Sequence, residues 1–270
     1  MKKVRVLVVQ YKPIYLDIKA NLEKIKRILR KYSFFKPQLV IFPEYALTGP
    51  LYGYYDLAFQ DDNAVFKELS LLAKNFNLNL IPGSFVRKIG VKKYNSSCFI
   101  NLEGKILDFY DKQYLWSSEK KFLEKGNKLT IFNTSLGKIV IQICADLHSS
   151  KLSDSYRQIK PDLIINLAMW SQEDIKSCAK IIPANIEFNQ TEILTKARAI
   201  ENRAYTVFCN FADSLEIKAK TGRIYQETSI GGSMIINPYG EIIAKTDNHK
   251  EQILFAELDL TKSHWSKYNY

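Results

Sequence analysis

The sequence predicts a layered α/β fold, and three observations support that prediction. The chain has 270 residues, 46% of them hydrophobic, which is enough to bury a full core in one large domain. Its first part alternates strand and helix patterns, whereas its middle and its end contain paired alternating runs joined by turn residues. Mixed sheets with helices on one side each are typical of layered packing, not of a TIM barrel or a Rossmann fold. We therefore expect one domain over residues 1–270.

The N-terminal part predicts two strand–helix–strand steps. Residues 4–10, VRVLVVQ, are apolar and β-branched, as in a buried strand. Apolar residues then recur at helical spacing over 18–29, and residues 37–44, PQLVIFPE, return to a strand. A second amphipathic helix is expected over 63–79 and a second returning strand over 80–86, LIPGSFV.

The middle of the chain predicts two hairpins. Residues 96–112 form two alternating runs around Glu103-Gly104, and residues 129–144 form two more around Leu136-Gly137. Antiparallel strands are therefore expected beside the parallel ones.

The last part predicts one more strand–helix–strand step and an antiparallel end. The strand 162–168, DLIINLA, is followed by a helix over 191–205 and a strand over 207–213. Residues 233–246 and 253–260 then have the pattern of antiparallel strands.

Charge and composition exclude several classes of protein. The formal net charge is +11 and the isoelectric point about 9.3, but the lysines are scattered, with no aromatic and basic stripe of the kind that binds nucleic acid. No stretch approaches the roughly 20 apolar residues of a membrane-spanning helix, and the apolar start of the chain is too short for a signal peptide. We therefore expect a cytoplasmic protein that binds neither nucleic acid nor membranes.

The four cysteines predict neither a disulfide scaffold nor a zinc site, because no two of them are paired as CxxC. Cys98, Cys178 and Cys209 are expected to be small inert core residues. Histidine-based catalysis and metal binding find little support among three histidines, two of them near the C-terminus, and no glycine-rich phosphate loop is present.

Three side chains with useful chemistry follow directly after apolar strands. Glu44 ends VIFPE, Lys112 ends FYDK, and Cys144 ends IVIQIC. Each alone has an ordinary explanation, as a loop or capping acid, a solvated lysine or a buried thiol. Strand ends at one edge of a sheet, however, are where α/β folds place their ligands.

Together the three residues match the needs of a cysteine nucleophile. A thiol is mostly protonated at neutral pH, so it needs a base, for which Glu44 is the candidate. Attack on a carbonyl creates an oxyanion, and the Lys112 ammonium and the Ala145 backbone N–H are candidates to stabilise it. Asp146 is expected to orient the turn after the nucleophile.

The segments FPEYALTG, YDKQYL and IQICAD, in this order, resemble the Glu, Lys and Cys motifs of the nitrilase superfamily of carbon–nitrogen hydrolases. The resemblance extends to residues 94–112, 196–210 and 231–244, and so spans the chain from Val4 to about Asp259. It implies a four-layer α-β-β-α sandwich, a homodimer or larger even oligomer, no cofactor and no metal.

The resemblance also implies roles for further residues. Glu119, followed by Phe122 and Gly126, matches a glutamate that assists the triad in amidase and carbamoylase branches, although an ordinary surface acid is the alternative. Trp170 and His148 are expected to bracket a small substrate pocket, with core packing as the alternative for Trp170. After the cysteine the chain has LHSSK where many members have an arginine, an aromatic, a proline and a glutamate, so the substrate is less defined than the reaction.

The sequence therefore predicts an amidase-like enzyme with a Glu-Lys-Cys triad. Its expected reaction is hydrolysis of a small linear amide or carbamoyl compound through a cysteine thioester, with release of ammonia. The alternatives are an ammonia-supplying glutaminase-type subunit, which would serve a separate synthetase, and an acyl-transferring relative. A catalytically silent scaffold and a nitrile hydrolase are less favoured, since the triad is intact and Ala145 and Asp146 replace the tryptophan and glutamate of nitrile-hydrolysing branches.

Overall fold

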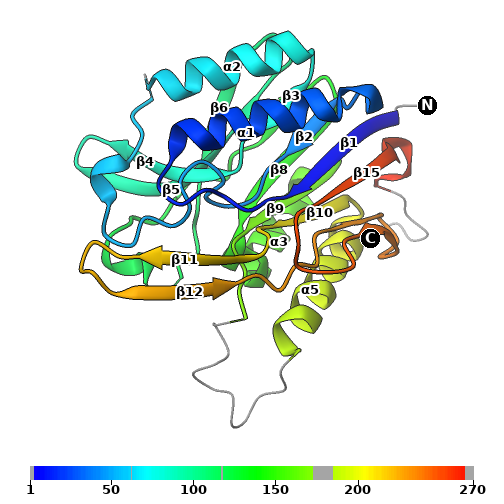
Figure 1. Cartoon of the computed structure of the whole chain (residues 1–270). Coiled ribbons are helices and arrows are strands. Elements are labelled where there is room, and N and C mark those ends of the chain that lie inside the picture. Colours follow the sequence, from blue (N-terminus) through cyan, green and yellow to red (C-terminus); the bar gives the residue numbers. More distant parts are fainter. Residues whose placement is uncertain (1–2, 62, 117, 173–184, 265–270) are drawn as a thin grey trace.

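Two mixed β-sheets lie face to face in the computed structural model, which describes residues 3–61, 63–116, 118–172 and 185–264 (Figure 1). The first sheet has the order β15 (Gln252–Asp259), β1 (Lys3–Gln10), β2 (Leu39–Ile41), β3 (Asn79–Ile81), β5 (Lys92–Ile100) and β4 (Ser84–Ile89), with β6 (Ile106–Asp111) paired to β5. The second has the order β14 (Ile242–Lys245), β13 (Met234–Ile236), β10 (Tyr205–Asn210), β9 (Leu163–Ala168), β8 (Gly137–Ile143) and β7 (Phe132–Thr134). A separate ribbon pairs β11 (Ser214–Lys218) with β12 (Ile224–Thr228).

Each large sheet has a parallel centre and antiparallel flanks. β1, β2 and β3 are parallel neighbours in the first sheet, as are β8, β9 and β10 in the second. The hairpins β5–β6, β7–β8 and β13–β14 are antiparallel, as their turn signals predict. The carboxyl ends of the central parallel strands therefore share one edge in each sheet.

Alternate residues of the central strands separate two cores. In β1, Val6 and Val8 face the second sheet and belong to one cluster with Ile141 of β8 and Ile165 of β9. The intervening residue Leu7 faces the other way, into the cluster formed with the helices. This alternation follows from the two-residue period of a strand, and it explains why both faces of these strands are apolar.

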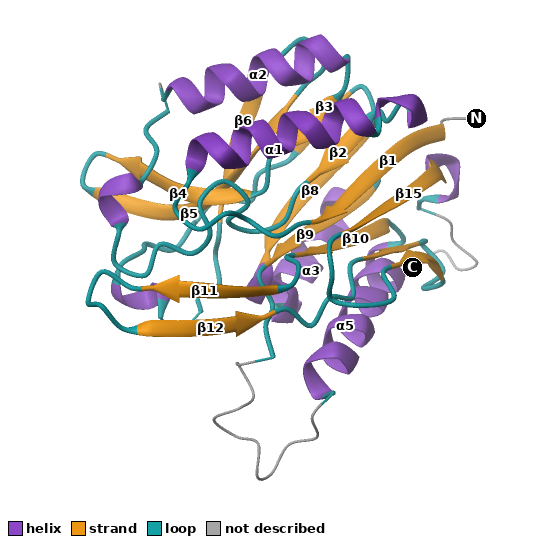
Figure 2. Ribbon diagram, in the orientation of Figure 1, coloured by secondary structure: helices purple, strands orange, loops and turns teal. Residues whose placement is uncertain are grey.

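Pairs of helices cover the outer faces of the sheets (Figure 2). α1 (Ile18–Lys31) and α2 (Ala64–Phe76) bury their apolar sides on the first sheet, and α3 (Ser150–Ile159) and α5 (Ile186–Asn202) cover the second. Asp17 and Asn63 cap α1 and α2 by accepting hydrogen bonds from Ala20 and Val65 backbone N–H groups. The predicted α-β-β-α sandwich is thus confirmed. Among the described residues, no helix combines the length and apolar composition that a membrane crossing requires.

The structure corrects one predicted element. Residues 80–86 do not form one returning strand, because β3 ends at Ile81 and a second strand, β4, begins at Ser84. Gly83 lies between them at φ +88°, in the left-handed region that favours glycine, and the strand is interrupted there without a reversal, because β3 and β4 both pair antiparallel with β5. The loop after β2, which contains Glu44, packs directly against this turn.

Replacing Gly83 by alanine is expected to destabilise the protein and disturb that loop. An added Cβ would lie 2.1 Å from the Pro43 carbonyl oxygen and 2.8 Å from the Ala46 Cβ. We expect Gly83→Ala to lower the free energy of unfolding by about 3 kcal/mol in urea denaturation. Gly90→Ala is the matched control, since Gly90 also has a positive φ of +58° but nothing within 4 Å; its expected cost is about 1 kcal/mol. Equal costs for the two variants would contradict the steric explanation.

Candidate active site

The three predicted reactive side chains meet in one cavity. Glu44 follows β2, Lys112 follows β6, and Cys144 follows β8, so both sheets contribute. All three line a cavity of about 1000 Å³, together with Glu119 and Ala145. Because the two sheets pack face to face, these strand ends, far apart in sequence, come together at one end of the sandwich.

Lys112 lies between two carboxylates. Its Nζ is 3.0 Å from Oε1 of Glu44 and 2.8 Å from Oε2 of Glu119. Lys112 and Glu44 are each 2% exposed and Glu119 is 8% exposed. Glu119 is therefore not the surface acid that the sequence left open, but a buried partner of the lysine.

Four further donors hold the two carboxylates in place. The Asn95 Nδ2 donates to Oε1 of Glu44 at 2.7 Å and to Oε1 of Glu119 at 2.8 Å. The Tyr45 hydroxyl donates to the same Glu119 oxygen at 2.8 Å. Backbone N–H groups complete the set, from Met169 to Oε2 of Glu44 and from Trp116 to Oε2 of Glu119, both at 2.8 Å. Each carboxylate therefore has several polar contacts despite its burial.

Sequence reasoning missed Asn95 and Tyr45. A signal for Asn95 is present, because polar residues 95–97 interrupt the buried half of β5, where apolar residues are expected. Tyr45 gives no comparable signal, since a tyrosine after a strand is compatible with ordinary packing. Its role depends on contact with Glu119, 74 positions away in the chain.

The buried charges shift one another's pKa values in opposite directions. Burial is the main factor acting on Glu44, and together with the nearby Glu119 charge it raises the Glu44 pKa above its usual value despite Lys112. Burial disfavours the Lys112 ammonium, but the two carboxylates outweigh it and raise the Lys112 pKa. For Glu119, burial is again opposed by Lys112 and by hydrogen bonds, and the pKa is lowered. The network therefore favours the charged forms of Lys112 and Glu119, whereas the protonated form of Glu44 is favoured more than for an ordinary glutamate.

Cys144 begins a tight turn at the end of β8. The turn is the 3₁₀ segment Cys144–His148, and Cys144 itself has φ +48°, an unusual conformation for a residue with a side chain. Such backbone strain clusters at functional sites. The side chain is half-buried and close enough to Lys112 to raise the lysine's pKa. The turn thus presents the thiol to the cavity beside a cation.

Asp146 connects the cysteine turn to the lysine loop. Its Oδ2 accepts hydrogen bonds from the Tyr110 hydroxyl at 2.7 Å and the Ile143 N–H at 2.9 Å. Its Oδ1 accepts from the N–H groups of Tyr114 at 2.8 Å and Gln113 at 3.2 Å. The predicted role in orienting the turn is therefore part of a larger one, because a single carboxylate joins β8 to the residues directly after Lys112.

Trp170 and His148 form part of the cavity wall. The Trp170 ring centroid lies 5.1 Å from that of His148 and 6.1 Å from that of Phe208, so the indole both lines the cavity and packs on the core. Its Nε1 donates to Oε2 of Glu187 at 2.5 Å. Partial loss of solvent contact lowers the His148 pKa, which leaves the imidazole neutral at pH 7. The volume of the cavity exceeds the small pocket expected from the sequence.

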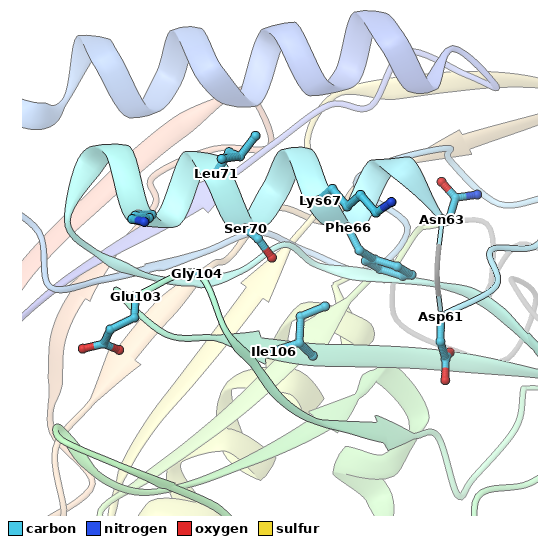
Figure 3. A pocket seen from close by; sticks show the side chains of 10 residues that line it. Asp61, Asn63, Phe66, Lys67, Ser70, Leu71, Glu103, Gly104 and Ile106 are labelled. Atoms are coloured by element: carbon cyan, nitrogen blue, oxygen red, sulfur yellow. The ribbon is translucent and has the colours of Figure 1, made fainter.

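Two of the remaining cysteines, Cys98 and Cys209, and a second hollow lie apart from this arrangement. Cys98 and Cys209 are fully buried, and burial raises the pKa of both thiols, so they are inert; Cys178 lies outside the described residues. A groove of about 420 Å³ between α2 and the β5–β6 turn contains none of the predicted site residues (Figure 3). In the described part of the chain, no group of three or more His, Cys, Asp or Glu side chains is arranged to hold a metal ion.

Comparisons with known proteins give a consistent family and fold. The model of the carbon–nitrogen hydrolase family matches residues 5–265. A probable nitrilase from Schizosaccharomyces pombe is 28% identical over 276 residues, covering 99% of this chain and 93% of that protein. A chloroplastic omega-amidase from Arabidopsis thaliana is 26% identical over 264 residues, covering 90% of this chain and 64% of that protein. Among solved structures, a carbon–nitrogen hydrolase from Helicobacter pylori superposes with a TM-score of 0.85 at 22% identity, covering 96% of this chain and 90% of that one.

Removing one acceptor from Asp146 is expected to separate the lysine loop from the cysteine turn. All four groups that contact this side chain are donors, so the amide of Asp146→Asn leaves two of them unmet. We expect a loss of about 2 kcal/mol in the free energy of unfolding at pH 7 and a fall in kcat of at least about tenfold. Asp108→Asn on β6, an exposed acid paired with Lys128, is the matched control and should change neither quantity appreciably. An Asp146→Asn variant as stable and active as the control would contradict the connecting role.

Proposed function

Because the chain belongs to the carbon–nitrogen hydrolase family, we propose that it hydrolyses a small linear amide or carbamoyl compound through a thioester on Cys144 and releases ammonia. The observation that carries the proposal is the placement of Lys112 between Glu44 and Glu119 in the cavity that Cys144 lines. Base, cation and thiol are then all within one substrate's reach.

The first half of the proposed reaction forms the acyl-enzyme. Glu44 takes the proton of the Cys144 thiol, and the thiolate attacks the amide carbonyl carbon. The Lys112 ammonium and the Ala145 N–H stabilise the resulting oxyanion. When the tetrahedral intermediate collapses, the carbon–nitrogen bond breaks, and Glu44 returns its proton to the leaving nitrogen. The products are ammonia and a thioester.

The second half regenerates the thiol. Glu44, again ionised, takes a proton from water, and the hydroxide attacks the thioester carbon. The carbon–sulfur bond breaks, and the Cys144 sulfur receives the proton from Glu44. A raised Glu44 pKa suits this alternation between base and acid near neutral pH.

Glu119 is proposed as the group that holds the triad and the substrate in register. Its contact with Lys112 and its shared donor with Glu44, the Asn95 amide, support this role. The alternative functions use the same thioester, with ammonia passed to a separate synthetase or the acyl group passed to another acceptor. The test below also includes nitriles, because the Schizosaccharomyces pombe relative is named a probable nitrilase.

Substitution of the nucleophile together with a substrate panel tests the proposal. We expect the purified protein to release ammonia from straight-chain amides or ureas and to convert the matching nitriles negligibly. Cys144→Ala is expected to lower kcat by about 10⁴-fold or more. Intact-mass measurement of the wild type under turnover should show the acyl group, and Cys144→Ala should show none. Cys98→Ala, which removes a buried thiol outside the cavity, is the control and should keep its activity. Nitriles turned over faster than every amide and urea would overturn the assignment.

Glu119 is expected to control the pH dependence of the reaction. Activity needs ionised Glu44, so it falls as the pH drops below the Glu44 pKa, which the Glu119 charge helps to raise. Glu119→Gln removes this charge, so the acidic limb of the pH profile should move to lower pH. It should also lower kcat by at least about 100-fold, because Glu119 is proposed to hold the triad and the substrate in register. Glu119→Asp keeps the charge and serves as the control, with the limb unmoved. If Glu119→Gln keeps full activity and an unchanged pH profile, the proposed part of Glu119 in the reaction is wrong and its role is only structural.

A homodimer formed across α5 is the proposed assembly. Ile193 is 65% exposed and Ile200 is 50% exposed on this helix, and Ile242 and Ile243 of β14 are 36% and 43% exposed. Light scattering should give about twice the 31.3 kDa mass of the chain. A double variant, Ile193→Lys with Ile200→Lys, should shift the protein to a monomer, because burying two lysines in an apolar contact is costly. Val91→Lys in the β4–β5 turn, where Val91 is 89% exposed, is the control. A wild-type monomer at micromolar concentration would contradict the proposal.

A further inference from the structure

The cavity is acidic although the protein is basic. The chain has a formal net charge of +11, yet the cavity lining includes Glu187 and Glu227 in addition to the carboxylates of the triad region. Apart from Lys112, the only lining cation among the described residues is Lys121, which is exposed and therefore screened by water. Partial desolvation lowers the His148 pKa despite the nearby Glu187, which favours the neutral imidazole. A ligand in the cavity therefore meets a negative environment.

Glu187 lies next to the reactive centre. It is half-buried in the first turn of α5, and its Oε2 accepts from the Trp170 indole, whose ring contacts His148 in the turn that begins at Cys144. Within the described residues it has no ion-pair partner at 4.0 Å or less. Arg198 lies on the same helix and influences the His148 pKa. It does not pair with Glu187, because its guanidinium pairs with Glu201 and donates to the Leu147 carbonyl. No cation among the described residues thus neutralises the Glu187 charge.

Glu227 lies in an aromatic part of the wall. It is half-buried on β12, and its Oε1 accepts from the Tyr52 hydroxyl at 2.9 Å. The Tyr52 ring packs on Tyr225, with centroids 4.9 Å apart, and all three residues line the cavity. The Arg223 guanidinium, which does not line the cavity, lies 4.9 Å from the centroid of the Tyr225 ring. This ring therefore already makes a cation–π contact. No described ion pair neutralises Glu227.

Carboxylates without a cationic partner, combined with tyrosine and tryptophan rings, form the kind of surface that binds a protonated amine. The same surface repels a carboxylate. Building on the proposed function, we propose that the substrate is an amide or carbamoyl compound with a protonated amino group at the end remote from the scissile carbonyl, recognised by Glu187 and Glu227. This sets the chain apart from a hydrolase selective for an anionic amide.

Three amides of equal length test the proposal. 4-Aminobutyramide carries an ammonium, pentanamide a methyl group and glutaramate a carboxylate at the same position. At pH 7.5 we expect kcat/KM to fall by about tenfold from the cation to the neutral compound and again to the anion, since partly screened charges act over several ångströms. A parallel series of (4-aminobutyl)urea, pentylurea and 5-ureidopentanoate covers carbamoyl compounds.

Charge-removing variants identify the residues responsible. Glu187→Gln and Glu227→Gln should each lower the ratio of kcat/KM for 4-aminobutyramide over pentanamide by about threefold or more, and the double variant should lower it further. Glu103→Gln is the matched control, because it removes one negative charge at the separate groove of Figure 3 and should leave the ratio unchanged. A ratio unchanged in both cavity variants, or an anionic substrate hydrolysed fastest, overturns this inference and leaves the proposed function standing.

A binding measurement separates this inference from the reaction itself. If no amide or urea is hydrolysed, the proposed function fails, and calorimetric titration with pentylammonium and with pentanoate still reports the charge preference of the cavity. Tighter binding of pentylammonium, weakened in Glu187→Gln with Glu227→Gln, supports the inference. Pentanoate bound as tightly as pentylammonium overturns it.

Discussion

The arrangement of the site depends on one buried ammonium. Taking Lys112 out of water costs several kcal/mol, and the protein offsets that cost by placing the carboxylates of Glu44 and Glu119 at hydrogen-bond distance from Nζ. Two carboxylates for one ammonium leave a net negative charge in a buried place. Burial is the main cause of the raised Glu44 pKa, and the surplus charge adds to it. The surplus also explains the need for additional donors, chiefly the Asn95 amide shared between the carboxylates. The positions of Glu44, Lys112 and Glu119 are therefore coupled, and none can change independently.

The sandwich determines where this network lies relative to the thiol. Glu44 follows a strand of the first sheet and Cys144 follows a strand of the second, so their separation is set by the apolar core between the sheets. That core consists of buried side chains from the inner faces of both sheets. Asp146 adds a polar connection at the end of the core, between the cysteine turn and the lysine loop. Apolar packing thus sets the spacing approximately, and hydrogen bonds to one carboxylate determine the final orientation.

The predicted and missed residues differ in where their signals lie. Glu44, Lys112 and Cys144 each follow closely after a strand, which is a local feature that a sequence displays. Asn95 leaves only a weak local trace as a polar residue in a buried strand, and Tyr45 leaves none. Their importance comes from contacts with Glu119, which is 24 positions from Asn95 and 74 from Tyr45. Long-range contacts of this kind have no local periodicity, so sequence patterns do not reveal them.

By itself, the sequence determined the layered α/β class, the order of most elements and the three residues placed after strands, because strand period, helix period and turn chemistry are local properties. It did not determine the interruption of the strand at Gly83, since residues 80–86 look like one apolar strand until the Glu44 loop is seen to occupy the space beside it. It also left Glu119 between a surface acid and a site residue. Only the tertiary structure shows that Glu119 is buried beside Lys112, because burial depends on which distant segments pack against a residue. The charge of the cavity was decided in the same way: Glu187 and Glu227 are ordinary acids in the sequence, and the fold brings them to the wall of one cavity.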